Sequence, residues 1–208
     1  MVDLSNRRRL PTRERRELIL SAALELFGRR GYEAVGMREV AAACEISAPG
    51  IYRHFPNKEA LLVGLFDRLS DQLTAAARAA TRIEDPLARL ASLIDFHIHQ
   101  VLSEPWLIPI YQREEGSLPA GERDRVREIL RTYRAAWLEP LARLRPGLRA
   151  EHARTTVVCT FGMLNSNAYH RSTLPERALR DLLTELSWRT LGLSAPPSPS
   201  SPPPAHRT

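Results

Sequence analysis

The side chains best suited to polar contacts are concentrated in one short stretch, ISAPGIYRHFPNKEALL, at positions 46–62. Tyr52, Arg53 and His54 follow one another and all carry hydrogen-bond donors. Lys58, a little further on, is the only lysine of the 208-residue sequence. A proline and a glycine stand just before these donors. Donors and cations gathered beside rigid and small residues suit the recognition of a polyanion.

The charge of the whole chain agrees with a polyanionic partner. The formal net charge is +6 at pH 7, and the first sixteen positions hold six arginines against two acidic residues. An arginine-rich surface that is merely solvated is the alternative interpretation. The expected secondary structure around these side chains helps to distinguish a polyanion-binding surface from a merely solvated one.

Helical periodicity runs through almost the whole chain with no convincing alternating strand, so we expect an all-α protein. Three short helices are expected before about residue 55. The first ends at Gly31, the second is preceded by Gly36, and the third is capped by Ser47 with Pro49 in its first turn. Asn57 is expected to cap a long fourth helix. Two short helices joined by a tight turn have the layout of a helix-turn-helix unit.

In a helix-turn-helix unit the last short helix lies in the major groove of DNA and its N-terminal part meets the base edges. The small residues from Ser47 to Gly50 give this helix a sharp entry and a slim profile. Lys58 falls in the first turn of the next helix, where the free N–H groups and the helix dipole already favour an anion. A lysine at this position opposes the dipole of its own helix, so it does not stabilise the helix. A phosphate that binds both the ammonium and the helix N-terminus explains the lysine better. The alternative is a capped corner with Tyr52 and His54 merely at the surface.

The segment GYEAVGMREVAAACEISAPGIYRHFPNKEALL resembles the DNA-binding region of the TetR family of bacterial repressors. That region commonly ends in Tyr-x-His-Phe-x-x-Lys-Glu-x-Leu, which this chain matches at Tyr52, His54, Phe55, Lys58, Glu59 and Leu61. The resemblance covers about residues 14–65. It implies that Tyr52, His54 and Lys58 hold the DNA backbone and that Arg53 reads bases. The full set of expected DNA-binding residues is Arg38, Ser47, Ala48, Pro49, Gly50, Tyr52, Arg53, His54 and Lys58.

Two residues depart from the family's pattern. Glu45 stands in the turn where the family usually has glycine, and a glutamate tolerates positive φ poorly. We therefore expect strain or a different turn there. Gly36 replaces the usual Ser or Thr cap of the second helix, which removes one possible phosphate contact.

The remaining sequence predicts further helices at 86–102, 122–143, 150–170 and 175–192, with one or two short ones in PWLIPIYQREEGSLP. Pro140 is expected to kink its helix or end its regular part. The expected organisation is a basic flexible arm at 1–11, a helix-turn-helix DNA-binding domain at 12–56, and a helical ligand-binding and dimerisation domain at 57–193. A Pro/Ser-rich tail at 194–208 is expected to be disordered.

The resemblance also implies a homodimer, a DNA operator of two symmetric half-sites and a small effector. The last two helices would form the dimer interface, and a buried monomer helix is the alternative for the run TTVVCTFGMLNS. The central helices would enclose a pocket for a hydrophobic effector. For each candidate lining residue, ordinary core packing is the alternative; these residues are Phe96, His97, Trp106, Tyr111, Tyr133, Trp137, Phe161 and Asn165.

The segments YQREEGSLPAGERDRVREILRTYRAAW and FGMLNS resemble TetR-type repressors of fatty-acid and sterol breakdown, many of which respond to acyl-CoA thioesters. The phosphates of such a ligand could pair with arginine side chains of this region, which are Arg113, Arg127, Arg131 and Arg134. A solvated helix face with paired charges is the alternative. Two other functions stay open: a TetR-type regulator of an efflux or antibiotic-response gene that senses an aromatic or drug-like ligand, and a non-specific DNA-binding protein without an effector.

Catalysis is not expected, because no nucleophile motif, glycine-rich phosphate loop or supported acid pair is present. His97 and His99 lie on different faces of one helix, so no metal site is predicted, and no cofactor is expected. Cys44 and Cys159 are predicted to be small buried hydrophobic residues. Without a secretory signal or a membrane-spanning run, the expected location is the cytoplasm.

Overall fold

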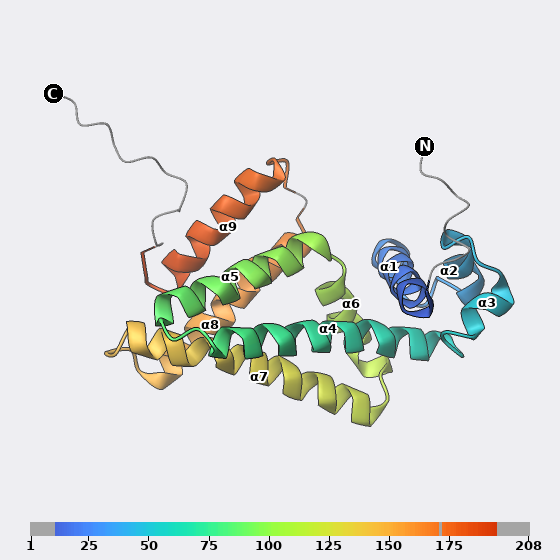
Figure 1. The fold of residues 1–208 in the computed structure, drawn as a ribbon. Coiled ribbons are helices and arrows are strands. Elements are labelled where there is room, and N and C mark those ends of the chain that lie inside the picture. The colour runs from blue at the N-terminus through green and yellow to red at the C-terminus, as the bar shows by residue number, and fades with distance from the viewer. Residues whose placement is uncertain (1–10, 171, 195–208) are drawn as a thin grey trace.

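The computed structural model describes residues 11–170 and 172–194, and its regular elements there are all helices (Figure 1). The all-α prediction is therefore confirmed. The arginines at positions 7–9 and the tail from 195 onward lie outside the described residues. Among the helices described, none combines the length and the apolar character that crossing a bilayer requires.

Three helices form the N-terminal group: α1 (Thr12–Arg30), α2 (Met37–Ala43) and α3 (Ala48–Tyr52). Gly31 ends α1 with φ at 88°, a conformation that glycine adopts without steric cost. Gly36 is the N-cap of α2, and its N–H donates to the side chain of Glu39 at 2.8 Å. The carboxylate of Glu39 thus satisfies the helix terminus although the cap residue has no side chain.

The turn between α2 and α3 contains strained backbone, which is one of the two outcomes expected from the glutamate at position 45. Glu45 has φ at 57°, in the left-handed region. This conformation costs a non-glycine residue about 1–2 kcal/mol. Backbone hydrogen bonds from Glu45 to Ala42 and from Ile46 to Ala41, both at 3.0 Å, hold the turn closed.

The long helix α4 (Lys58–Thr81) runs from the N-terminal group into the rest of the molecule, where it packs along α5 (Pro86–Ser103) and α7 (Ala120–Leu144) (Figure 1). Asn57 caps α4 by accepting the N–H of Ala60 at 2.7 Å. The short α6 (Leu107–Glu114) and the 3₁₀ turn η2 (Glu115–Ser117) join α5 to α7. A second pair of helices follows, α8 (Ala150–Asn165) and α9 (Glu176–Thr190), with η3 (Ser166–Ala168) between them. The buried apolar side chains of all these helices form one continuous cluster.

One sequence prediction is narrowed and another needs correction. Helix α7 continues past the buried Pro140 to Leu144, so Pro140 does not end the helix, and a kink is the remaining expectation at this position. Cys159 is exposed on α8, whereas Cys44 is buried as predicted. The apolar and small residues around Cys159 surround the helix on more than one side, so periodicity could not tell which side faces this chain's own core.

Candidate nucleic-acid interface and internal cavity

The short helix α3 is held by its own cap and by its buried underside. Ser47 caps it by accepting the N–H of Gly50 at 3.2 Å, and a Cβ on Gly50 would lie 3.0 Å from that same oxygen. Glycine at this position therefore lets the cap form. Ile51 and Phe55 are fully buried beneath the helix, as the sequence predicts. Helix α3 is thus fixed from below and leaves its other face free.

The free face of α3 carries side chains with exposed polar groups. Tyr52 is 48% exposed, and Arg53, Pro49 and Ser47 are exposed beside it. Arg38 is exposed on the neighbouring helix α2. Ala48 is half-buried and Gly50 is buried. These two residues therefore affect the packing of the helix and offer no polar side chain for binding.

His54 lies just behind this surface and is half-buried. Burial lowers the pKa of His54 below its usual value, and the positive charges of Arg15, Arg53 and Arg16 lower that pKa further. At neutral pH the imidazole is therefore predominantly uncharged. It can hydrogen-bond a phosphate but adds no charge to the surface.

Lys58 at the start of α4 is tied to the link between α1 and α2. Its Nζ donates to the carbonyl of Glu33 at 3.2 Å, lies 3.8 Å from the Glu33 carboxylate and sits 4.1 Å above the ring of Tyr32. The side chain is 24% exposed. Lys58 therefore braces the N-terminal group, and its ammonium still reaches the surface at the N-terminal end of α4.

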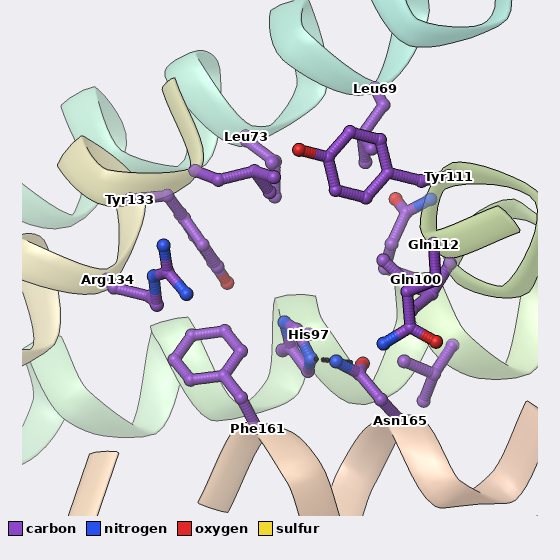
Figure 2. A pocket seen from close by; sticks show the side chains of 13 residues that line it. Leu69, Leu73, His97, Gln100, Tyr111, Gln112, Tyr133, Arg134, Phe161 and Asn165 are labelled. Carbon is purple, nitrogen blue, oxygen red and sulfur yellow. Dashed lines mark hydrogen bonds between the residues drawn. The ribbon is translucent and has the colours of Figure 1, made fainter. Parts of the chain in front are cut away.

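A cavity of about 150 Å³ lies between α4, α5, α6, α7 and α8 (Figure 2). Five of the eight residues predicted to line an effector pocket meet there: His97, Tyr111, Tyr133, Phe161 and Asn165. The other lining residues are Leu69, Leu73, Gln100, Val101, Ile108, Gln112, Leu130 and Arg134. Of these, Gln100 could have been found from the sequence, because it lies three positions after His97 and so shares its helix face.

The three remaining predicted residues do not line the cavity. Phe96 packs its ring against Tyr133 at 5.9 Å between centroids, and Trp137 is fully buried behind His97. Trp106 lies against α1, where its Nε1 donates to Glu25 at 3.1 Å. A Cβ on Gly28 of α1 would lie 2.2 Å from the ring of Trp106, so helix α1 and this indole are in close contact.

The four arginines predicted to meet a phosphorylated head group lie in different surroundings in the structure. Arg134 lines the exposed rim of the cavity and pairs with no carboxylate of the described residues. Arg127 pairs with Glu115, and Arg131 pairs with Glu128 at 2.5 Å on the same helix. Arg113 is exposed on α6. Only Arg134 is therefore well placed to meet a charged group on a molecule in this cavity.

A polar chain connects the cavity to α1. Gln100 donates to Glu104 at 2.7 Å, and Glu104 lies 2.5 Å from the guanidinium of Arg68 on α4. Arg68 donates to Ser21 of α1 at 3.2 Å and lies 3.6 Å from Glu17. The cavity and the N-terminal group thus share a continuous set of polar contacts.

No group of three His, Cys, Asp or Glu side chains within the described ranges is arranged to hold a metal ion. His97 is buried and His99 exposed, so their helix points the two imidazoles apart. Asp95 pairs with Arg180 of α9 at 3.5 Å.

The fold and these two features define an all-helical protein with an N-terminal helix-turn-helix and a cavity in its larger helical part. Residues 19–65 match the family model for bacterial regulatory proteins of the tetR family, and residues 84–169 match that for a tetracyclin repressor-like C-terminal domain. The two matches together span more than half of the sequence. The chain belongs to the TetR family, as the resemblance of its motif suggested.

Curated relatives include an activator and a repressor. The chain is 44% identical over 79 residues to the transcriptional activator FasR of Mycolicibacterium smegmatis, covering 37% of this chain and 36% of the relative. It is 34% identical over 122 residues to the repressor KstR of the same organism, covering 57% and 60%. The chain thus spans about a third to three fifths of the length of these relatives.

Solved structures of low sequence identity share the fold. A TetR-family regulator from Rhodococcus RHA1 has a TM-score of 0.71 at 21% identity over 87% of this chain and 98% of its own. AibR, solved in complex with isovaleryl coenzyme A and operator DNA, has a TM-score of 0.68 at 23% identity over 88% and 99%. Each of these likenesses covers nearly nine tenths of this chain.

Proposed function

We propose that this protein is a transcriptional regulator that binds a pseudo-palindromic DNA operator as a homodimer and is released from it by a small hydrophobic effector. The observation that carries the proposal is the free face of α3, where Tyr52 and Arg53 project from a helix whose underside is buried. A side chain such as Arg53 can form bidentate hydrogen bonds with guanine in the major groove. Arg38, Ser47 and Lys58 add further hydrogen-bond donors on α2, at the start of α3 and at the start of α4. The relatives are named as transcriptional regulators, which favours regulation over catalysis.

Exposed apolar residues support a dimer formed through α8 and α9. Of the five large hydrophobic residues that are exposed in the described part of the chain, four lie on these two helices or between them: Val158, Tyr169, Leu174 and Leu182. Val158 is 53% exposed, and the neighbouring Cys159 and Gly162 leave room for a close helix contact. Large apolar side chains exposed in this number on neighbouring segments favour an interaction site on these two helices. A twofold dimer through it would present two copies of α3 to successive turns of DNA.

Two effector classes have support. The rings of Tyr111, Tyr133 and Phe161 around the cavity favour a compact aromatic ligand. Arg134 at the rim favours an acyl-CoA thioester whose acyl group enters the cavity while its phosphates stay outside. The neighbouring structure of AibR holds isovaleryl coenzyme A, which is the reason to include this second class.

The test is fluorescence anisotropy with duplexes that tile the DNA flanking the protein's own gene. We expect one duplex with a symmetric site to bind about 10³-fold more tightly than a scrambled duplex of the same length. Arg53→Ala should reduce this preference at particular base positions while affinity for scrambled DNA stays nearly the same. Equal affinity for all duplexes with a steep salt dependence would instead indicate a non-specific DNA-binding protein without an effector.

A further inference from the structure

The walls of the cavity are mostly apolar. Its inner end, by which we mean the part lined by the buried side chains of His97 and Tyr133, is polar. The cavity volume of about 150 Å³ is lined by leucine, isoleucine and valine side chains together with aromatic rings. An engineered apolar cavity of about this volume binds benzene. The part of a ligand that fits inside is therefore a compact group of about the size of one six-membered ring.

His97 contributes a hydrogen-bond acceptor to this inner end. Its side chain is buried, and its Nε2 lies 3.1 Å from the amide oxygen of Asn165. Because an amide oxygen only accepts hydrogen bonds, Nε2 carries the proton of the ring. Burial lowers the pKa of His97 to about 4, so the imidazole is neutral and Nδ1 is left as an acceptor. This Nδ1 is buried and has no hydrogen-bond partner among the described residues.

Tyr133 contributes a donor beside that acceptor. Its hydroxyl is buried, and the indole N–H of Trp137 lies close to its oxygen. No hydrogen-bond acceptor for the proton of this hydroxyl is found within the described part of the chain. Burial raises the pKa of this phenol far above its usual value, so the hydroxyl keeps its proton. The rings of Tyr133 and His97 lie nearly parallel with centroids 6.0 Å apart. Figure 2 shows the hydroxyl of Tyr133 directed toward the side of the cavity where His97 lies.

Two unpaired buried groups at the same end of a cavity lower stability until something satisfies them. A carboxylate cannot satisfy both, because it only accepts hydrogen bonds and would face the lone pair of Nδ1. The cation that lines the cavity, Arg134, is exposed, whereas His97 and Tyr133 are buried. A pure hydrocarbon would leave both groups unpaired. A hydroxyl group satisfies both at once, since it donates one hydrogen bond and accepts another.

We propose that the inner end of this cavity recognises a hydroxyl group on a compact, uncharged and otherwise apolar ligand. The ligand's O–H donates to Nδ1 of His97, and its oxygen accepts from the hydroxyl of Tyr133. The inference rests on the proposed role of the cavity as the effector site. The hydroxyl can belong to a free molecule the size of phenol or to a short hydroxylated acyl group on coenzyme A, with Arg134 near the phosphates in the second case.

The test is calorimetric titration of the full chain, without DNA, with two pairs of probes that differ in one hydroxyl. Phenol is compared with toluene, and 3-hydroxybutyryl-CoA with butyryl-CoA. We expect the hydroxylated member of at least one pair to bind about tenfold more tightly, and the pair that discriminates identifies the source of the hydroxyl. Arg134→Ala should weaken both CoA esters equally and leave phenol unaffected.

Tyr133→Phe is the matched variant, since it removes one hydroxyl and keeps the ring. It should reduce the preference for the hydroxylated probe several-fold while binding of the partner that lacks the hydroxyl stays unchanged. Equal binding within both pairs, no binding of any probe, or an unchanged preference in Tyr133→Phe would overturn the proposal. Operator binding is measured separately, so a protein that binds its operator but ignores the hydroxyl loses this inference and keeps its proposed function.

Discussion

At the scale of single residues, Lys58 combines two tasks that a sequence motif alone does not separate. Its ammonium braces Tyr32 and Glu33 and also stands at the N-terminal end of α4. We expect Lys58→Ala to weaken binding to operator and scrambled DNA alike and to reduce the salt slope by about one unit. Arg78→Ala, at the exposed far end of the same helix, is the control. Binding measured at several salt concentrations tests this, and an unchanged slope would remove Lys58 from the phosphate contacts.

His97 makes a second prediction at this scale, which concerns pH. Its pKa in the folded protein, about 4, lies below the ordinary value of 6.5. Between these two values the unfolded chain binds a proton that the folded chain does not, so this residue makes the free energy of unfolding rise with pH in that window. It should therefore cost about 2 kcal/mol of stability at pH 5 relative to pH 7.5.

The variant His97→Gln should lose this part of the pH dependence. Denaturant unfolding of both proteins at pH 5 and pH 7.5 measures the difference. Identical pH dependence in the two proteins would show that His97 is not buried in its neutral form.

At the scale of elements, the contact between α1 and α6 joins the N-terminal group to the cavity. Trp106 precedes α6, which supplies Ile108, Tyr111 and Gln112 to the cavity, and the indole lies against Gly28 of α1. Contents of the cavity that move α6 would therefore act directly on α1.

Gly28→Ala tests how closely α1 packs against Trp106. The new methyl group would lie 2.2–2.6 Å from atoms of Trp106, so we expect a loss of about 1–3 kcal/mol and a melting temperature lower by about 2–4 °C for each kcal/mol. Gly121→Ala on α7 is the matched control, because nothing lies within 4 Å of its Cβ. A melting temperature that changes equally little in both variants would mean that α1 and α6 are not in close contact.

At the scale of the whole molecule, α8 and α9 lie at the end opposite the α1–α3 group (Figure 1). Together with the segment between them, they hold most of the large apolar side chains that are exposed among the described residues. We expect Val158→Arg to convert a dimer into a folded monomer, because a charge in an apolar interface loses its hydration. Ala75→Arg, at an exposed position of α4, should stay dimeric. Sedimentation velocity gives the oligomeric state and circular dichroism the helix content. A dimeric Val158→Arg variant would place the interface elsewhere.

The sequence by itself predicted the helices and the family, because both depend on local patterns. Periodic apolar residues and the caps Ser47 and Asn57 follow from chemistry within a few positions of the chain. The buried side of α3 was predictable for the same reason. Residues 52–58 were recognisable because their spacing along the chain is itself the motif.

Only the tertiary structure decided which side chains share a space. Phe96, Trp106 and Trp137 are as aromatic as Tyr133 and Phe161, yet they lie outside the cavity. Membership of a cavity depends on how five helices pack, and no residue type or spacing encodes the crossing of helices that are distant in sequence. The same reason explains Cys159, whose exposure depends on which face of α8 the rest of this chain covers, and the unpaired groups of His97 and Tyr133, which meet only because α5 and α7 lie side by side.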